Sequence, residues 1–182
     1  MIAVYPEFVA LDVTYKLLRM GLPVYVTLSE DVNCQSEILA VCILVNEDRE
    51  SILWFLNTFK EENPEILKLN SIITDKDLNE RGAIRVVFPA ANFIICIFHV
   101  QRTFRREITF AKMNITQSQR NESLEILVKL VYAPTTEKFE ELERDFTKKA
   151  PLSVLNYYNK NWLPISNARA LLLNKILLKI RK

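Results

Sequence analysis

Two aspartates, Asp12 and Asp75, each follow a short apolar run of the sequence. A carboxylate placed just past a buried strand can be held rigidly at the edge of a sheet, and two of them close in space would attract divalent cations. Carboxylate oxygen suits hard ions such as Mg²⁺ or Mn²⁺, and such ions support phosphoryl transfer in nucleic-acid enzymes. The pair is therefore the candidate catalytic and metal-binding centre.

The same two residues also have a structural explanation, which spacing alone favours. Asp75 precedes a helical pattern that starts near Leu78, so it is a candidate helix cap, although Asp77 suits that role better. Asp12 would then solvate the end of a strand. A catalytic centre of this kind also usually needs a third acid.

Cys96 and His99 form a Cys-x-x-His pair, and both are potential zinc ligands. Two ligands do not make a structural zinc site, and positions 96 and 99 of one strand point to opposite faces. The pair could converge only if the strand ended between them. The alternative is a buried cysteine that acts as a small hydrophobic residue, followed by a histidine at the start of a helix.

Three arginines, Arg102, Arg105 and Arg106, follow directly in a basic amphipathic stretch from Gln101 to Met113. Arginine at such spacing can contact the phosphate backbone of DNA. The alternative is an ordinary solvated face of a helix.

The composition limits the classes of function. The 182 residues carry a net charge of only +2, so any surface for nucleic acid must be local. Two glycines argue against glycine-rich phosphate loops, and three cysteines with one histidine fit a reducing compartment. We expect no membrane partner and no small-molecule substrate. The expected location is the nucleus or the cytoplasm, with the nucleus preferred.

Apolar periodicity predicts the elements that position these residues. Strands are expected at 8–14, 24–28, 38–45, 71–74 and 92–100. Helices are expected at 46–62, 78–87, 101–113, 118–132, 137–149, 152–162 and 168–182. The first part therefore reads βββ-α-β-α-β, an α/β mixed sheet, and an all-helical segment follows it. The predicted domain boundary lies near residue 113, giving segments 1–113 and 114–182.

Several motifs in this order resemble the Mutator-like (MULE) transposase domain, and most closely the RNase H-like domain of the transposase-derived zinc finger SWIM domain-containing proteins. The resemblance spans roughly residues 8–165. It is carried by Leu-Asp-Val-Thr-Tyr-Lys from residue 11, Trp-Phe-Leu-x-x-Phe-Lys from residue 54, Ile-Thr-Asp-Lys-Asp from residue 73 and Cys-Ile-Phe-His-Val-Gln-Arg-Thr-Phe-Arg-Arg from residue 96.

This resemblance implies an RNase H-like core in which Asp12 and Asp75 stand where the first two catalytic acids stand. Cys96 and His99 stand where the family's Cys-x-x-His pair stands. In active relatives a third acid lies beyond a helical insertion, in a motif around Arg-x-Glu-Ser-x-Asn. The present sequence contains a segment that resembles the one preceding this motif, but the motif itself does not follow. Glu122 lies too early in the helical segment to replace the third acid.

Three hypotheses follow. The preferred one is a transposase-derived RNase H-like domain without strand-transfer activity that serves as a DNA-associated or interaction module, with Mg²⁺ or Mn²⁺ as cofactor only if it is active. The second is a truncated piece of an active metal-dependent transposase or nuclease. The third is a pure protein-interaction module, in which the lysine-studded apolar helix expected at 168–182 binds a protein partner.

Overall fold

The computed structural model describes residues 8–15, 17–30 and 35–165. The chain divides into two compact units, Met1–Cys96 and Ile97–Lys182. The predicted C-terminal helix at 168–182 lies outside the described residues.

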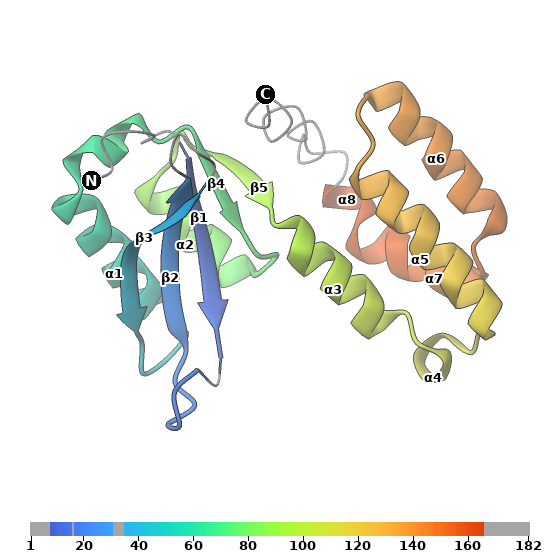
Figure 1. Ribbon diagram of the computed structural model, residues 1–182, viewed down its shortest axis with the longest axis horizontal. Coiled ribbons are helices and arrows are strands. Elements are labelled where there is room, and N and C mark those ends of the chain that lie inside the picture. Colours follow the sequence, from blue (N-terminus) through green and yellow to red (C-terminus); the bar gives the residue numbers. More distant parts are fainter. Residues whose placement is uncertain (1–7, 16, 31–34, 166–182) are drawn as a thin grey trace. The chain divides into compact units, whose positions relative to one another are not determined.

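The first unit is built on a five-stranded mixed sheet (Figure 1). Its strands are β1 (Phe8–Thr14), β2 (Val24–Glu30), β3 (Ser36–Ile43), β4 (Ser71–Thr74) and β5 (Asn92–Ile95). They lie in the order β3-β2-β1-β4-β5. Strands β1, β2 and β3 pair antiparallel, whereas β4 runs parallel to both β1 and β5. The predicted βββ-α-β-α-β order is confirmed.

Helices α1 (Arg49–Glu62) and α2 (Leu78–Val87) supply the apolar cover of this sheet, together with the short 3-10 helix η1 (Pro64–Lys68). Asp48 caps α1 by accepting a hydrogen bond from the Ser51 amide at 2.8 Å. The buried face of α1 consists of Ile52, Phe55, Leu56 and Phe59. These residues pack in one core with strand residues such as Val9, Leu11, Tyr25 and Ile72.

The predicted strand at 92–100 is wrong in its second half. The strand β5 stops at Ile95, and helix α3 (Ile97–Glu107) begins two residues later. Val100 and Phe104 are buried at helical spacing, so the apolar run joins the end of a strand to the first turn of a helix. A short apolar run does not distinguish these two cases.

The second unit is helical, as predicted. Besides α3, it contains α4 (Phe110–Met113), α5 (Gln117–Val131), α6 (Thr136–Lys149), α7 (Leu152–Asn161) and α8 (Leu163–Ile165). Thr116 and Gln119 form a capping box at the start of α5. Phe104 lies 4.8 Å from Trp162 between ring centroids, and Phe146 lies 5.1 Å from Tyr158.

The division between the two units falls after Cys96, earlier than the boundary expected near residue 113. The reason is the packing of α3. Its buried Phe104 contacts Trp162, and the Arg120 side chain of α5 donates hydrogen bonds to the Ile108 and Arg105 carbonyl oxygens at 2.8 and 3.4 Å. Helix α3 therefore belongs with the helices that follow it. None of the described helices is long and apolar enough to cross a membrane.

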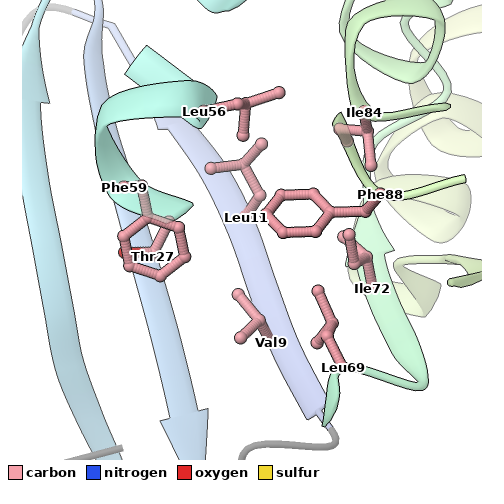
Figure 2. Close-up of a pocket in the computed structure, with 9 residues that line it drawn as sticks. All are labelled: Val9, Leu11, Thr27, Leu56, Phe59, Leu69, Ile72, Ile84 and Phe88. Atoms are coloured by element: carbon pink, nitrogen blue, oxygen red, sulfur yellow. The ribbon is translucent and has the colours of Figure 1, made fainter. Parts of the chain in front are cut away.

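A small cavity of about 10 Å³ lies in the core of the first unit (Figure 2). It is lined by Val9, Leu11, Thr27, Leu56, Phe59, Leu69, Ile72, Ile84 and Phe88. The hydroxyl group of Thr27 already donates to the Ala40 carbonyl oxygen at 3.3 Å. The cavity therefore offers a ligand no free polar group, and we regard it as a packing gap in the core.

Candidate functional site

The register of the sheet sets Asp12 and Asp75 at the same level. In the parallel pair of β1 and β4, Val9 lies opposite Ile72 and Ala10 lies opposite Ile73. Continued by two residues, this register brings Asp12 level with Asp75, just past the end of β4. Because neighbouring strands lie about 4.8 Å apart, the two residues lie on neighbouring strands at the same edge of the sheet, which is formed by the carboxyl ends of β1 and β4.

Local hydrogen bonds hold the two side chains. The Thr14 hydroxyl donates to Asp12 Oδ2 at 3.2 Å, and the Asp77 amide donates to Asp75 Oδ1 at 2.9 Å. Asp12 is half-buried within β1, whereas Asp75 is exposed. Strand β1 continues through Thr14, so Asp12 lies two residues before its end.

The cap of α2 is Asp77. Its Oδ1 atom accepts hydrogen bonds from the amides of Asn79 and Glu80 at 2.8 and 3.0 Å. The alternative that Asp75 caps this helix is therefore wrong, and the preference for Asp77 is confirmed. Asp75 instead accepts a hydrogen bond from the backbone amide of this cap residue.

Two further carboxyl groups belong to this edge, and the sequence reasoning missed both. Glu47 precedes α1 and accepts hydrogen bonds from the hydroxyl groups of Tyr15 and, at 3.2 Å, Tyr25. Glu80 lies in the first turn of α2 with only 2% of its surface exposed. The signal for Glu80 was available, because Glu80, Ala83, Ile84 and Val87 follow the i, i+3, i+4, i+7 pattern of a buried helix face.

Burial and the neighbouring carboxylates raise the pKa of three side chains, those of Glu80, Tyr15 and Tyr25. Burial, followed by the negative charges of Asp75, Asp77, Glu47 and Asp12 in that order, raises the pKa of Glu80 to about 8. Burial and the nearby Glu47 carboxylate raise the pKa of both Tyr15 and Tyr25. At neutral pH, Glu80 therefore holds a proton and the tyrosines remain donors to Glu47.

The side chains at this edge fit a metal ion only in part. Among the residues that the structure describes, no group of three or more His, Cys, Asp or Glu side chains is assembled to hold a metal. Asp12 and Asp75 offer two carboxylates, a set that suits Mg²⁺, which commonly keeps several water ligands. The acid pair thus resembles part of a phosphoryl-transfer centre without a third ligand in place.

Strand β5 ends at Ile95, before Cys96, and α3 begins at Ile97, so Cys96 and His99 do not lie on one strand. Cys96 is a half-buried free cysteine, and the ring of His99 lies edge-on to Phe98 with centroids 5.5 Å apart. In the described part of the chain, no third His, Cys, Asp or Glu joins them in a metal-binding group. Their role as zinc ligands stays a prediction.

The three arginines lie on the exposed side of α3. Arg102, Arg105 and Arg106 are all exposed, while Val100 and Phe104 are buried on the opposite side. Residues at i, i+3 and i+4 share one face of a helix. Arg106 forms an ion pair with Glu107 at 2.8 Å, so Arg102 and Arg105 contribute most of the uncompensated charge.

Comparison with known proteins decides the family. Residues 1–94 match the model of the RNaseH-like domain of zinc finger SWIM domain-containing protein 1/3. The chain belongs to this family. The matched residues run from the start of the chain into β5, so this RNaseH-like domain corresponds closely to the first unit, and the helical unit lies beyond the match.

Two curated relatives place this RNaseH-like domain among transposase-derived sequences. Protein FAR1-RELATED SEQUENCE 5 of Arabidopsis thaliana is 27% identical over 108 residues, which is 58% of this chain and 13% of the relative. The transposase for insertion sequence element IS1201 of Lactobacillus helveticus is 25% identical over 158 residues, which is 85% of this chain and 37% of the relative. The chain thus spans only a minor part of either relative.

A solved structure of the simian T-cell lymphotropic virus intasome in complex with PP2A regulatory subunit B56 gamma also aligns with the chain. The TM-score is 0.36 and the sequence identity is 10%, over 72% of this chain and 50% of the other. The assignment to the RNaseH-like family rests on the family match and not on this structure.

Proposed function

We propose that this transposase-derived RNase H-like domain associates with DNA through the exposed arginines of α3 and does not itself carry out strand transfer. The proposed association with DNA rests on one observation. Arg102, Arg105 and Arg106 are all exposed and share one face of α3. Guanidinium groups bind phosphate oxygens with two parallel hydrogen bonds, which favours arginine at phosphate-binding surfaces.

The proposal that strand transfer is absent is supported by the acid pair. Two-metal phosphoryl transfer needs both ions placed against the attacking and leaving oxygens. Asp12 and Asp75 supply two carboxylates at one edge of the sheet, and the described residues assemble no group of three metal-binding side chains there. An ion held by this pair alone would be poorly positioned, and positioning accounts for much of the rate in such reactions.

A salt titration tests the association with DNA. The full chain is titrated into a fluorescently labelled duplex at several NaCl concentrations, and anisotropy gives the Kd at each. We expect the logarithm of the affinity to fall linearly with the logarithm of the salt concentration, because phosphate contacts release counterions. The triple variant Arg102→Ala, Arg105→Ala and Arg106→Ala should weaken binding and reduce the slope by about 1 for each lost contact.

A second triple variant, Arg49→Ala, Lys148→Ala and Lys160→Ala, is the matched control. It removes the same charge from three exposed positions outside α3. Its affinity and slope should stay near those of the wild type. Equal losses in both triple variants would show that only net charge matters. No DNA binding by the wild-type chain would favour a pure protein-interaction module and contradict the proposal.

A DNA-associated role agrees with the predicted nuclear location. Imaging of the tagged chain in cells would test it, and exclusion from the nucleus would contradict it.

A further inference from the structure

An exposed aromatic ring lies on the same face of α3 as two of its arginines. Phe98, in the first turn of the helix, is 67% exposed. The i, i+3, i+4, i+7 spacing of one helix face is followed by Phe98, Gln101, Arg102 and Arg105. An edge-on contact with the His99 ring, 5.5 Å between centroids, gives the Phe98 ring a defined position. The proposed phosphate-binding face therefore begins with an aromatic side chain.

A second exposed ring is held beside this face by a hydrogen bond. Tyr132, the cap residue at the C-terminal end of α5, is 56% exposed. Its hydroxyl oxygen accepts a hydrogen bond from the side-chain amide of Gln101 at 3.1 Å. Because Gln101 lies about one turn along α3 from Phe98, this contact brings the Tyr132 side chain to the same side of the helix. Two exposed aromatic side chains thus accompany the arginines of α3.

The combination of rings and guanidinium groups fits a nucleic-acid strand with unpaired bases. A single exposed apolar residue is ordinary on a protein surface, but an apolar protein partner placed over Phe98 would also have to desolvate Arg102 and Arg105, which is costly. A single strand satisfies both kinds of side chain, because its phosphates bind guanidinium groups and its bases stack on aromatic rings. In a duplex the bases are stacked on one another, so their faces are closed to Phe98.

We propose that this face of α3 binds single-stranded DNA in preference to duplex DNA, with Phe98 stacking on an unpaired base while Arg102 and Arg105 contact neighbouring phosphates. Tyr132 is a second position at which a base stacks. The proposal rests on the DNA association proposed above, and it adds the kind of DNA and the side chain that selects it. Every base has a π face, so we expect little dependence on sequence.

Affinities for matched single-stranded and duplex oligonucleotides test the proposal. The full chain is titrated into a fluorescently labelled single strand and into the same strand annealed to its complement, and anisotropy gives both Kd values. We expect the single strand to bind more tightly. Phe98→Ala should weaken binding to the single strand by at least about five-fold, the lower end of what stacking on one aromatic residue contributes. Its effect on duplex binding should be much smaller.

The salt dependence of single-strand binding separates stacking from charge. Phe98→Ala should leave the slope of log affinity against log salt unchanged, because no phosphate contact is lost. Arg105→Ala should reduce that slope by about 0.7, the value for one phosphate contact with a single strand. The control is Trp54→Ala, which removes an exposed aromatic side chain from α1 of the first unit and should bind both forms of DNA as the wild type does.

Two outcomes would overturn this inference and leave DNA association through the arginines standing. One is equal affinity of the wild type for the single strand and the duplex. The other is a folded Phe98→Ala variant that binds the single strand as tightly as the wild type, which would assign the ring to a protein contact. Failure of the wild type to bind either form would instead contradict the proposed function itself.

A measurement on the wild type alone keeps the proposal testable should a variant fail to fold. Abasic sites introduced into the single strand keep every phosphate and remove the bases that stack. The affinity of the wild type should fall by at least about five-fold, with an unchanged salt slope. Equal affinity for the intact and the abasic strands would contradict stacking on Phe98.

Discussion

Glu80 is a carboxylic acid on the buried face of α2, beside the apolar residues Ala83 and Ile84. The carboxyl group is 2% exposed and lies among other carboxyl groups. The folded state therefore holds its proton more tightly than the unfolded chain does. Where a proton is bound more strongly in the folded state, the free energy of unfolding falls as the pH rises.

The pH dependence of unfolding tests this at the residue scale. The pKa of Glu80 rises from its ordinary value of 4.5 to about 8 on folding, so its contribution is fully present below about pH 4.5 and is lost as the pH rises towards 8. With about 1.4 kcal/mol for each pH step, the loss is at most about 5 kcal/mol. Urea unfolding with a chelator present, at several pH values, measures it.

The Glu80→Gln variant is the reference for this pH prediction, because its amide does not titrate. The free energy of unfolding of the wild type should fall relative to that of the variant between about pH 5 and 8. Parallel pH profiles would mean that Glu80 is ionised in the folded protein at neutral pH.

The hydrogen bonds at the start of α2 give a prediction at the scale of an element. Asp77 Oδ1 accepts from two backbone amides of the first turn, so Asp77→Ala should lower the free energy of unfolding by about 1 kcal/mol. Asp77→Asn keeps an acceptor oxygen and should cost much less. Chemical denaturation of both variants makes the comparison, and equal losses would show that the charge of Asp77 matters rather than the cap.

The packing of α1 against the sheet gives a second prediction at this scale. Ile52 is 1% exposed in the core, whereas Ile43, at the end of the edge strand β3, is 53% exposed. Ile52→Ala should cost about 2–5 kcal/mol because it removes buried methylene groups and leaves a cavity. Ile43→Ala removes the same atoms from an exposed site and should cost far less. Similar losses at both sites would contradict the proposed core.

The sequence was a good guide to elements with a clear start or a clear periodicity. The helix from Leu78 to Val87 was predicted with the bounds that the structure shows, because it lies between the Asp77 cap and Pro89. Positions 96 to 100 were misassigned, because the apolar run there hides the change from strand to helix. The domain boundary followed this error, since α3 was grouped with the strands before it rather than the helices after it.

At the candidate site, the sequence identified Asp12 and Asp75 but not the groups around them. The pairing of β1 with β4, which sets the two acids level, joins segments about 60 residues apart and leaves no local signal. Glu47 and Glu80 were passed over because each is an ordinary charged residue near the start of a helix. Only the buried pattern of α2 singles out Glu80.

At the scale of the whole molecule, family membership and activity are separate matters. The chain carries the RNaseH-like domain over residues 1–94 and covers 13% and 37% of two curated relatives. The net charge of +2 provides little general attraction to DNA. We therefore propose that association with DNA depends on one face of α3, and that the acid pair is an inherited feature without strand-transfer activity.

One measurement tests this central claim most directly. The full chain is incubated with supercoiled plasmid DNA and Mn²⁺, alongside the Asp12→Asn variant, and the DNA is separated on an agarose gel. We expect the plasmid to stay supercoiled with both proteins. Nicking, cleavage or joining of DNA by the wild type that is lost in Asp12→Asn would contradict the account and show that the acid pair is catalytic.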